Sequence, residues 1–221
     1  MELGYYAAQG NAEPVRLVLA YFNLPYTEVN PKDPKDATEV AAILAKHPFD
    51  FPNFPYFIDG DSYITEPNAI ITHLTQKLGR TEFHGQFGPD KVLHQQLIDV
   101  IEDIRQSIFK IFWEENHLES YNSKALLTTE RLGQLSKFLR QKDFLLGYPT
   151  LADFNLFYLV NSIDKLASNL KVTSFVKDFG NLKSHNERIR GLKGVKEYLA
   201  GEGVADRPLI PLSSFYSVWW I

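Results

Sequence analysis

Few side chains of this sequence stand in the patterns that common catalytic mechanisms require. Cysteine is absent, which excludes disulfides, thiolate metal ligands and any mechanism in which the protein supplies the sulfur nucleophile. The histidines show neither an HExxH pattern nor acidic neighbours at metal-ligand spacing, and they are scattered at positions 47, 73, 84, 94, 117 and 185. The sequence therefore predicts no metal site, and any thiol chemistry must use the thiol of another molecule.

The signatures of phosphate binding and of serine hydrolases are missing too. The chain has no P-loop, no dinucleotide-binding glycine pattern and no G-x-S-x-G sequence. The remaining candidate for chemistry is Tyr5, in the segment Leu3-Gly4-Tyr5-Tyr6-Ala7. Taken alone, this segment also fits a buried strand whose tyrosine only packs in the core.

Composition and charge limit the partners of the chain. The 221 residues are 44% hydrophobic, and 23 Lys and Arg oppose 27 Asp and Glu, for a net charge of -4. This charge provides no basic field for a phosphate backbone, so we expect no nucleic-acid partner. No stretch approaches the roughly 20 apolar residues that span a bilayer, and the N-terminus lacks a signal-peptide pattern. The sequence therefore predicts a cytoplasmic protein of one large or two small domains.

The N-terminal region changes periodicity often, which is typical of a small α/β domain. Residues 3–7 and 25–29 have the apolar character of short strands. Between them a helix begins near Glu13 and Pro14, where a first turn favours these residue types. Strand, helix and strand in this order favour a parallel crossover. A second, short helix is expected to end near His47.

A hairpin and a third helix follow. Residues 54–58 and 62–65 flank Asp59-Gly60-Asp61, and Asp-Gly between aromatic and β-branched residues indicates a tight turn. A helix is expected over 68–78. The order βαβ, α, ββ, α is that of a thioredoxin-like domain, which we assign to residues 1–79.

The remainder of the chain is predicted to be helical. Residues 80–88 are rich in glycine and are interpreted as a linker, and from residue 89 an apolar seam continues for about five helical turns. Thr150 and Asp153 form a capping box at the start of a core helix. We assign residues 89–221 to an all-helical domain with helices near 123–142, 150–168 and 186–200. The irregular tail is expected to pack on this domain through Phe215, Tyr216, Trp219 and Trp220.

Four sequence strings connect the chain to a known family. They are Leu3-Gly4-Tyr5-Tyr6, the run from Asp50 to Gly60, Asn68-Ala69-Ile70, and Thr150-Leu151-Ala152-Asp153-Phe154. Together with the two-domain order, these strings make the chain resemble the cytosolic glutathione transferases. It looks most similar to the Mu class, with the Sigma class as the nearest competitor.

The resemblance implies an enzyme that conjugates glutathione to hydrophobic electrophiles, with Tyr5 as the catalytic residue. The Tyr5 hydroxyl would donate a hydrogen bond to the sulfur of glutathione. A free thiol with a pKa of about 8.5 is only about 3% thiolate at neutral pH, and a donor that stabilises the anion lowers this pKa. Tyrosine suits the task because its own pKa of about 10 keeps it protonated. Tyr6 stands where Mu enzymes usually have tryptophan and would line the glutathione site.

The string Asn53-Phe54-Pro55 supplies the second implied element. In the family this proline is cis, and the backbone N–H and C=O of the residue before it, here Phe54, pair with the cysteinyl group of glutathione. Asn53 would assist through its side chain. Phe51 matches the residue that Mu-type subunits insert into a hydrophobic pocket of their partner, which implies a homodimer.

Residues outside these strings complete the implied site. Asp103 matches the acidic residue that reaches the γ-glutamyl amine across the dimer interface, although a solvated helix charge fits equally well. Ala8, Asn11 and Trp113, with the aromatic tail, would wall the pocket for the hydrophobic electrophile.

The chain departs from the family where the carboxylates of glutathione bind. Members usually have Gln-Ser or Glu-Ser before Asn-Ala-Ile, whereas this chain has Glu66-Pro67. Proline supplies neither the N–H nor the hydroxyl of that serine, and losing two hydrogen bonds to a carboxylate would cost on the order of 3 kcal/mol. Val40 and Leu44 replace the tryptophan and lysine of the glycine clamp, which leaves Lys46 as a possible substitute.

These departures keep a second interpretation open. A catalytically weak, glutathione-transferase-like binding or scaffold protein would retain the fold without efficient turnover. Apolar ligands would then bind with similar affinity whether or not glutathione is present.

Overall fold

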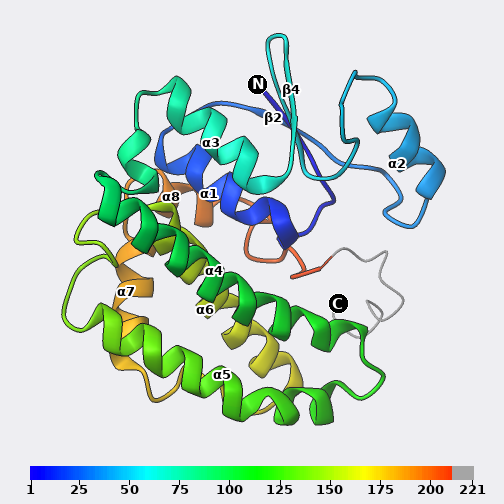
Figure 1. Cartoon of the computed structure of the whole chain (residues 1–221). Coiled ribbons are helices and arrows are strands. Elements are labelled where there is room, and N and C mark those ends of the chain that lie inside the picture. Colours follow the sequence, from blue (N-terminus) through cyan, green and yellow to red (C-terminus); the bar gives the residue numbers. More distant parts are fainter. Residues whose placement is uncertain (211–221) are drawn as a thin grey trace. The chain divides into compact units, whose positions relative to one another are not determined.

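The computed structural model describes residues 1–210, which form two compact units. The first unit combines Met1–Arg80 with the described residues from Lys193 onward, and the second comprises Thr81–Leu192. Figure 1 shows a sheet with helices in the first unit and helices alone in the second. The predicted fold class, a thioredoxin-like α/β domain and an all-helical domain, is confirmed.

Four short strands form the sheet of the first unit in the order β2-β1-β3-β4. They are β1 (Glu2–Gly4), β2 (Thr27–Val29), β3 (Tyr56–Asp59) and β4 (Ser62–Thr65). β1 pairs with β2 in parallel and with β3 antiparallel, which confirms the predicted crossover. β3 and β4 form the predicted hairpin, in which Gly60 has a φ of 60° that glycine adopts at little cost.

Helices cover this sheet. They are η1 (Gly10–Ala12), α1 (Glu13–Tyr21), α2 (Ala37–Leu44), α3 (Pro67–Lys77) and α8 (Val195–Leu199). α1 packs against α3 and against α8, and Figure 1 shows α2 well apart from α1 and α3. Asp36 is the N-cap of α2, and its carboxylate accepts the N–H groups of Thr38 and Glu39, as an N-cap residue should.

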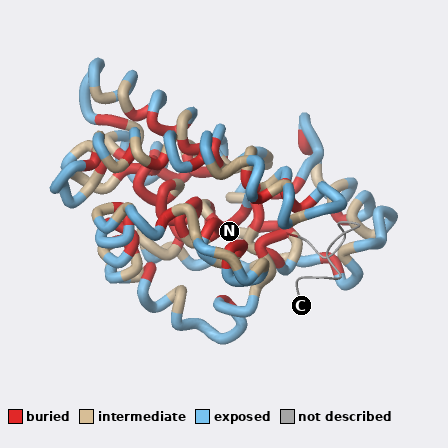
Figure 2. Tube along the Cα trace, turned by 90° about the horizontal axis from the view of Figure 1, so that it is seen from below, coloured by how far each residue is buried: buried red, intermediate tan, exposed pale blue. Residues whose placement is uncertain are grey.

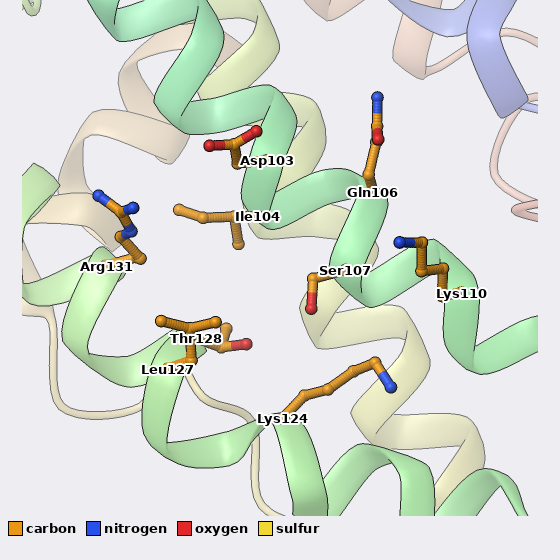
Figure 3. A pocket seen from close by; sticks show the side chains of 9 residues that line it. All are labelled: Asp103, Ile104, Gln106, Ser107, Lys110, Lys124, Leu127, Thr128 and Arg131. Carbon is orange, nitrogen blue, oxygen red and sulfur yellow. The ribbon is translucent and has the colours of Figure 1, made fainter.

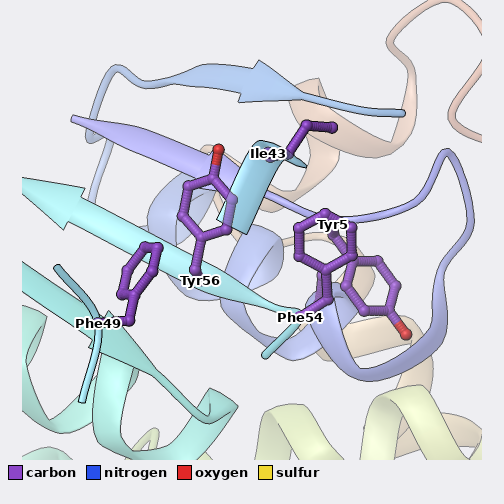
Figure 4. Close-up of a cluster of buried hydrophobic side chains, with 6 residues drawn as sticks. Tyr5, Ile43, Phe49, Phe54 and Tyr56 are labelled. Carbon is purple, nitrogen blue, oxygen red and sulfur yellow. The ribbon is translucent and has the colours of Figure 1, made fainter. Parts of the chain in front are cut away.

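The side chains of β3 alternate between the two faces of the sheet. Tyr56 belongs to a group of buried side chains on the α2 side, which we call the aromatic cluster and which is shown in Figure 4. The cluster consists of Tyr5, Ala12, Ile43, Phe49, Phe54 and Tyr56. Phe57 is also fully buried, and because strand side chains alternate it points to the opposite face. Both faces of the sheet are therefore covered, and Tyr5 lies on the α2 side.

The second unit is a helical bundle with its own core. Its elements are η2 (Thr81–His84), α4 (Gly88–Lys110), η3 (Ile111–Trp113), α5 (His117–Leu139), α6 (Leu151–Leu170) and α7 (Gly180–Arg190). α6 packs against both α4 and α7 and is buried along most of its length. Figure 2 shows the buried residues gathered in the interior of the chain and the exposed residues on the outer turns.

Asp153 anchors the start of α6. Its carboxylate accepts the N–H of Thr150 at 2.9 Å and the N–H of Leu145 at 2.7 Å, which confirms the predicted capping arrangement. His185 of α7 contacts the same carboxylate at 2.9 Å, and both side chains are fully buried. A buried carboxylate is stable only when its oxygens are paired, so this one residue connects a loop, α6 and α7.

Residues 186–200 do not form the single helix that the sequence predicted. α7 ends at Arg190 and α8 begins at Val195. Gly194, between them, has a φ of 82°, and a Cβ at this position would lie 2.1 Å from the carbonyl oxygen of Ala20. Periodicity continued across the break, but close packing on α1 requires a glycine turn there.

The structure groups other segments differently from the sequence analysis. Residues 193–210 pack with the first unit, whereas we had assigned them to the helical domain. Four residues of the expected linker form η2 (Thr81–His84). α5 begins at His117, before the expected residue 123, because the Asn116 side chain caps it. The aromatic tail residues 215–220 lie outside the described residues. No helix in the described part of the chain is long and apolar enough to cross a membrane.

Candidate active site

Tyr5 is held at the C-terminal end of β1 by bonds on both sides of its backbone. Its N–H donates to the carbonyl of Val29 at 3.0 Å, and its carbonyl accepts the side-chain amide of Asn30 at 2.7 Å. Its side chain is 5% exposed, and the ring lies 5.5 Å from that of Tyr6 and 6.3 Å from that of Phe54. The ring is thus fixed by the aromatic cluster.

The Tyr5 hydroxyl reaches the turn that follows β1. Its oxygen accepts the backbone N–H of Asn11 at 3.0 Å. The neighbouring Gly10 has a φ of 44°, and a Cβ there would lie 2.2 Å from the hydroxyl oxygen. The turn therefore needs glycine both for its backbone angle and for the space that the hydroxyl occupies.

The loop between β1 and η1 depends on the buried guanidinium of Arg16. Its Nη1 donates to the carbonyl of Ala8 at 2.7 Å, and its Nη2 donates to the carbonyl of Tyr6 at 3.3 Å. Glu28 and Glu13 face the same guanidinium at 2.5 and 3.2 Å. Burial by itself lowers the pKa of Arg16, but Glu28 and Glu13 raise it above its ordinary value, so the group stays charged.

The string Asn53-Phe54-Pro55 lies beside Tyr5. The Phe54-Pro55 peptide bond is cis, as the resemblance implied, and the ring of Phe54 is 5.2 Å from that of Tyr6. The N–H of Phe54 donates to the Asn53 side-chain oxygen at 2.9 Å, and the Asn53 amide donates to the carboxylate of Glu66 at 3.0 Å. The structure therefore brings six of the predicted residues together within the first unit, namely Tyr5, Tyr6, Asn53, Phe54, Pro55 and Glu66.

The start of α3 combines an unusual backbone angle with a proline. Glu66 has a φ of 70° and precedes Pro67, the first helical residue. A non-glycine residue at positive φ costs on the order of 1–3 kcal/mol, and such residues gather at functional sites. Pro67 carries no N–H, so this helix start lacks one of the backbone donors that usually bind an anion.

The expected glycine clamp is apolar. Val40 and Leu44 of α2 pack against the aromatic cluster, as do Tyr6 and Val29. Lys46 is exposed and follows the end of α2. No tryptophan or lysine stands at these two α2 positions, and Lys46 remains the predicted substitute.

Two predicted residues belong to the second unit. Asp103 lies on α4 and lines a cavity of about 470 Å³ between α4 and α5, which is shown in Figure 3. Three cationic side chains, Lys110, Lys124 and Arg131, line the same cavity.

Trp113, in η3, is 56% exposed. In the first unit, Ala8 is buried and Asn11 is exposed. Among the described residues, no group of three or more His, Cys, Asp or Glu side chains is arranged to hold a metal ion.

Sequence reasoning missed Arg16 and the residues that surround it. Arg16 lies in an apolar stretch of α1 and is fully buried. A single arginine between Val15 and Leu17 was the available signal, because a charge on the apolar face of a helix requires buried partners. Tyr198 and Arg207 do not stand in an apolar stretch of this kind, so the sequence gives no indication of their buried partners.

Comparison with known proteins identifies the family. The chain matches the family model of the glutathione S-transferase N-terminal domain over residues 1–76 and that of the glutathione S-transferase C-terminal domain over residues 102–202. It is 27% identical to glutathione S-transferase 2 of Gallus gallus, over 99% of this chain and 96% of the relative. It is also 27% identical to glutathione S-transferase Mu 2 of Mus musculus, over 98% of each chain.

A solved structure agrees with these relatives. The crystal structure of the glutathione S-transferase Blo t 8 is similar with a TM-score of 0.82 at 25% identity, over 97% of this chain and 98% of that one. The chain therefore belongs to the glutathione S-transferase family, and it is a glutathione transferase that uses glutathione as a co-substrate.

Gly10→Ala is expected to displace the Tyr5 hydroxyl, because the added Cβ would lie 2.2 Å from it. The rate of glutathione conjugation to a chlorodinitrobenzene should fall by about tenfold or more. Gly60→Ala is the matched control, since Gly60 has a φ of 60° but no described atom beyond its chain neighbours within 4 Å of a Cβ. Equal rates for Gly10→Ala and the unaltered protein would contradict this placement of the hydroxyl.

Proposed function

We propose that the protein conjugates glutathione to hydrophobic electrophiles and that Tyr5 holds the glutathione sulfur as a thiolate. The observation that carries the proposal is the buried side chain of Tyr5, whose hydroxyl is fixed by the Asn11 N–H at 3.0 Å. A tyrosine hydroxyl can accept one hydrogen bond and donate another. Aimed at sulfur, that donor stabilises the anion, and each unit by which the thiol pKa falls is worth about 1.4 kcal/mol.

The chemistry is a nucleophilic substitution or addition at carbon. The thiol of glutathione loses its proton to solvent, and the sulfur forms a bond to the electrophilic carbon while a leaving group, where present, departs with its electron pair. Tyr5 acts on the sulfur before the bond forms. Ala8, Asn11 and Trp113 are proposed to contact the electrophile.

The residues of the first unit fit the sulfur end of glutathione better than its carboxylate ends. Tyr5 and the backbone carbonyl of Phe54 suit the cysteinyl group, whereas the N–H of Phe54 donates to Asn53. The carboxylate of Glu66 suits the γ-glutamyl ammonium because it only accepts hydrogen bonds. Pro67 offers no donor to the γ-glutamyl carboxylate. Asp103 and Lys46 are proposed to complete the site.

Tyr5→Phe should raise the pKa of bound glutathione and lower turnover by about tenfold or more at neutral pH, while glutathione affinity stays nearly unchanged. Without the Tyr5 hydroxyl as a donor, the thiolate is less stable and the thiol pKa rises. Activity is therefore lost at low pH and recovered as the pH rises. Ultraviolet absorbance of the thiolate across pH, with steady-state kinetics, measures both effects.

Tyr6→Phe serves as the control for this experiment, since Tyr6 is expected to line the site without acting on sulfur. A thiol pKa that is the same with Tyr5 and with Phe at position 5 would remove Tyr5 from the mechanism.

Pro67→Ser should tighten glutathione binding by about a hundredfold, because it restores an N–H and a hydroxyl for the γ-glutamyl carboxylate. Pro67→Ala restores the N–H alone and should give a smaller gain. Calorimetric titration with glutathione measures both dissociation constants. If neither variant binds glutathione more tightly, the start of α3 does not contact this carboxylate.

We also propose a cytoplasmic, Mu-like homodimer in which Phe51 of one copy packs on a hydrophobic surface of the other. The Phe51 side chain is 78% exposed, and in the second unit Leu126 and Leu127 are 83% and 57% exposed. Covering large exposed apolar side chains by a second copy would remove apolar surface from water, which is favourable. The similarity to glutathione S-transferase Mu 2 supports the Mu-like assignment.

Phe51→Ser should weaken self-association by about a hundredfold, as expected for a buried aromatic anchor. Sedimentation equilibrium over a range of concentrations gives the dissociation constant. Phe87→Ser is the control, because Phe87 is similarly exposed at 70%. The same association constant for both variants would count against Phe51 at the interface.

A catalytically weak, glutathione-transferase-like binding or scaffold protein is the second candidate function, and Pro67 is the observation that favours it. In that case glutathione would bind without forming a thiolate, and apolar ligands would bind independently of glutathione. The absorbance titration described for Tyr5 separates the two functions in the unaltered protein.

A further inference from the structure

The last described residues of the chain lie against the turn that positions the Tyr5 hydroxyl. The N–H of Gln9 donates to the carbonyl of Pro208 at 2.8 Å, and the N–H of Gly10 donates to the carbonyl of Leu209 at 2.9 Å. The next N–H along the chain, that of Asn11, donates to the Tyr5 hydroxyl. The turn at residues 9–11 therefore presents three consecutive N–H groups. Two of them bind residues 208–209, and the third binds the Tyr5 hydroxyl.

Arg207 connects this segment to the first unit. Its Nη2 donates to the carboxylate of Glu28 at 3.0 Å, and its Nη1 donates to the hydroxyl of Tyr198 at 3.0 Å. The Tyr198 hydroxyl in turn donates to the carboxylate of Glu13 at 2.9 Å. The segment is further held by Leu209 and Ile210, each only 4% exposed. Arg207 therefore joins β2, α1 and α8 by side-chain bonds.

The network closes on Arg16. Glu28 and Glu13 both also face the Arg16 guanidinium, so two carboxylates are balanced by two guanidinium groups, those of Arg16 and Arg207. Burial raises the pKa of Glu13 above its ordinary value, and Arg16, Tyr198 and Arg207 oppose this effect. Without the charge of Arg207, the carboxylates of Glu13 and Glu28 would share the single cation of Arg16. A buried charge that lacks its partner strongly destabilises the fold.

We infer that Arg207 is a positioning residue for Tyr5: with Tyr198 it fixes residues 207–210, which hold the turn at residues 9–11 and thereby the Tyr5 hydroxyl. This inference rests on the proposed role of Tyr5 in thiolate formation. A segment nearly 200 residues away in sequence would then determine how well the hydroxyl is aimed. A purely structural anchor would lower stability without changing the thiol pKa.

The first test measures the pKa of bound glutathione by thiolate absorbance and the pH profile of kcat/KM. Arg207→Gln should raise the thiol pKa by about half a unit to one unit and lower kcat/KM about three- to tenfold below that pKa, with recovery at high pH. Arg207→Lys, which keeps the charge, should recover part of the loss. Tyr198→Phe removes one hydroxyl from the network, and it provides a second variant if Arg207→Gln does not fold.

Two controls separate positioning from stability. In a Tyr5→Phe background, Arg207→Gln should change the rate less than about twofold, because the two residues act in series. Arg188→Gln removes a 3.0 Å ion pair with Asp143 in the second unit, and it should leave the thiol pKa unchanged. All variants are compared at a temperature at which thermal denaturation shows them folded.

A ligand-free measurement tests the same inference without relying on thiolate formation. Amide hydrogen exchange at Gln9, Gly10 and Asn11 should become about tenfold faster in Arg207→Gln, but not in Arg188→Gln. Unchanged exchange at these residues together with an unchanged thiol pKa would overturn the inference. If the unaltered protein forms no thiolate, the proposed function fails, and the exchange result alone decides whether Arg207 positions the turn.

Discussion

The buried guanidinium of Arg16 is the interaction on which the arrangement of the first unit depends. The loop after β1 leaves the sheet, so its carbonyls need partners that no strand provides. Arg16 donates to three of them, those of Tyr6, Ala8 and Gln9. Burying an unpaired guanidinium would cost more free energy than these hydrogen bonds return. The ion pairs of Arg16 with Glu13 and Glu28 offset this cost. The Tyr5 hydroxyl is held by the turn that this loop leads into.

In the second unit a buried carboxylate, that of Asp153, binds backbone N–H groups as Arg16 binds carbonyls in the first. Asp153 accepts the backbone N–H of Leu145 at Oδ1 and that of Thr150 at Oδ2, and His185 contacts Oδ1 as well. In both units a fully buried ionic group satisfies backbone atoms outside regular secondary structure and connects elements distant in sequence. Such groups confer a unique arrangement that apolar packing alone specifies less sharply.

The proposed glutathione site has two parts that differ: the residues proposed for the sulfur end are closely held, and those expected at the carboxylate end depart from the family pattern. Tyr5, Phe54 and Asn53 are held by hydrogen bonds and aromatic contacts. At the start of α3, by contrast, Glu66 has positive φ and Pro67 removes a donor. In the proposed site, this positive φ and this missing donor would affect the affinity for glutathione more directly than the chemistry at sulfur.

The sequence by itself determined the features that depend on near neighbours. The Asp59-Gly60 hairpin, the crossover and the Asp153 cap are set by turn and capping residues. The strings around Tyr5 and Pro55 are the basis on which the sulfur end of the site is proposed. Only the tertiary structure decided the break at Gly194, the placement of residues 193–210 and the roles of Arg16 and Arg207. Their partners are distant in sequence: Arg207 and Glu28 are 179 positions apart. No local pattern records which buried charges will meet, because that pairing is selected by the cost of leaving each of them unpaired.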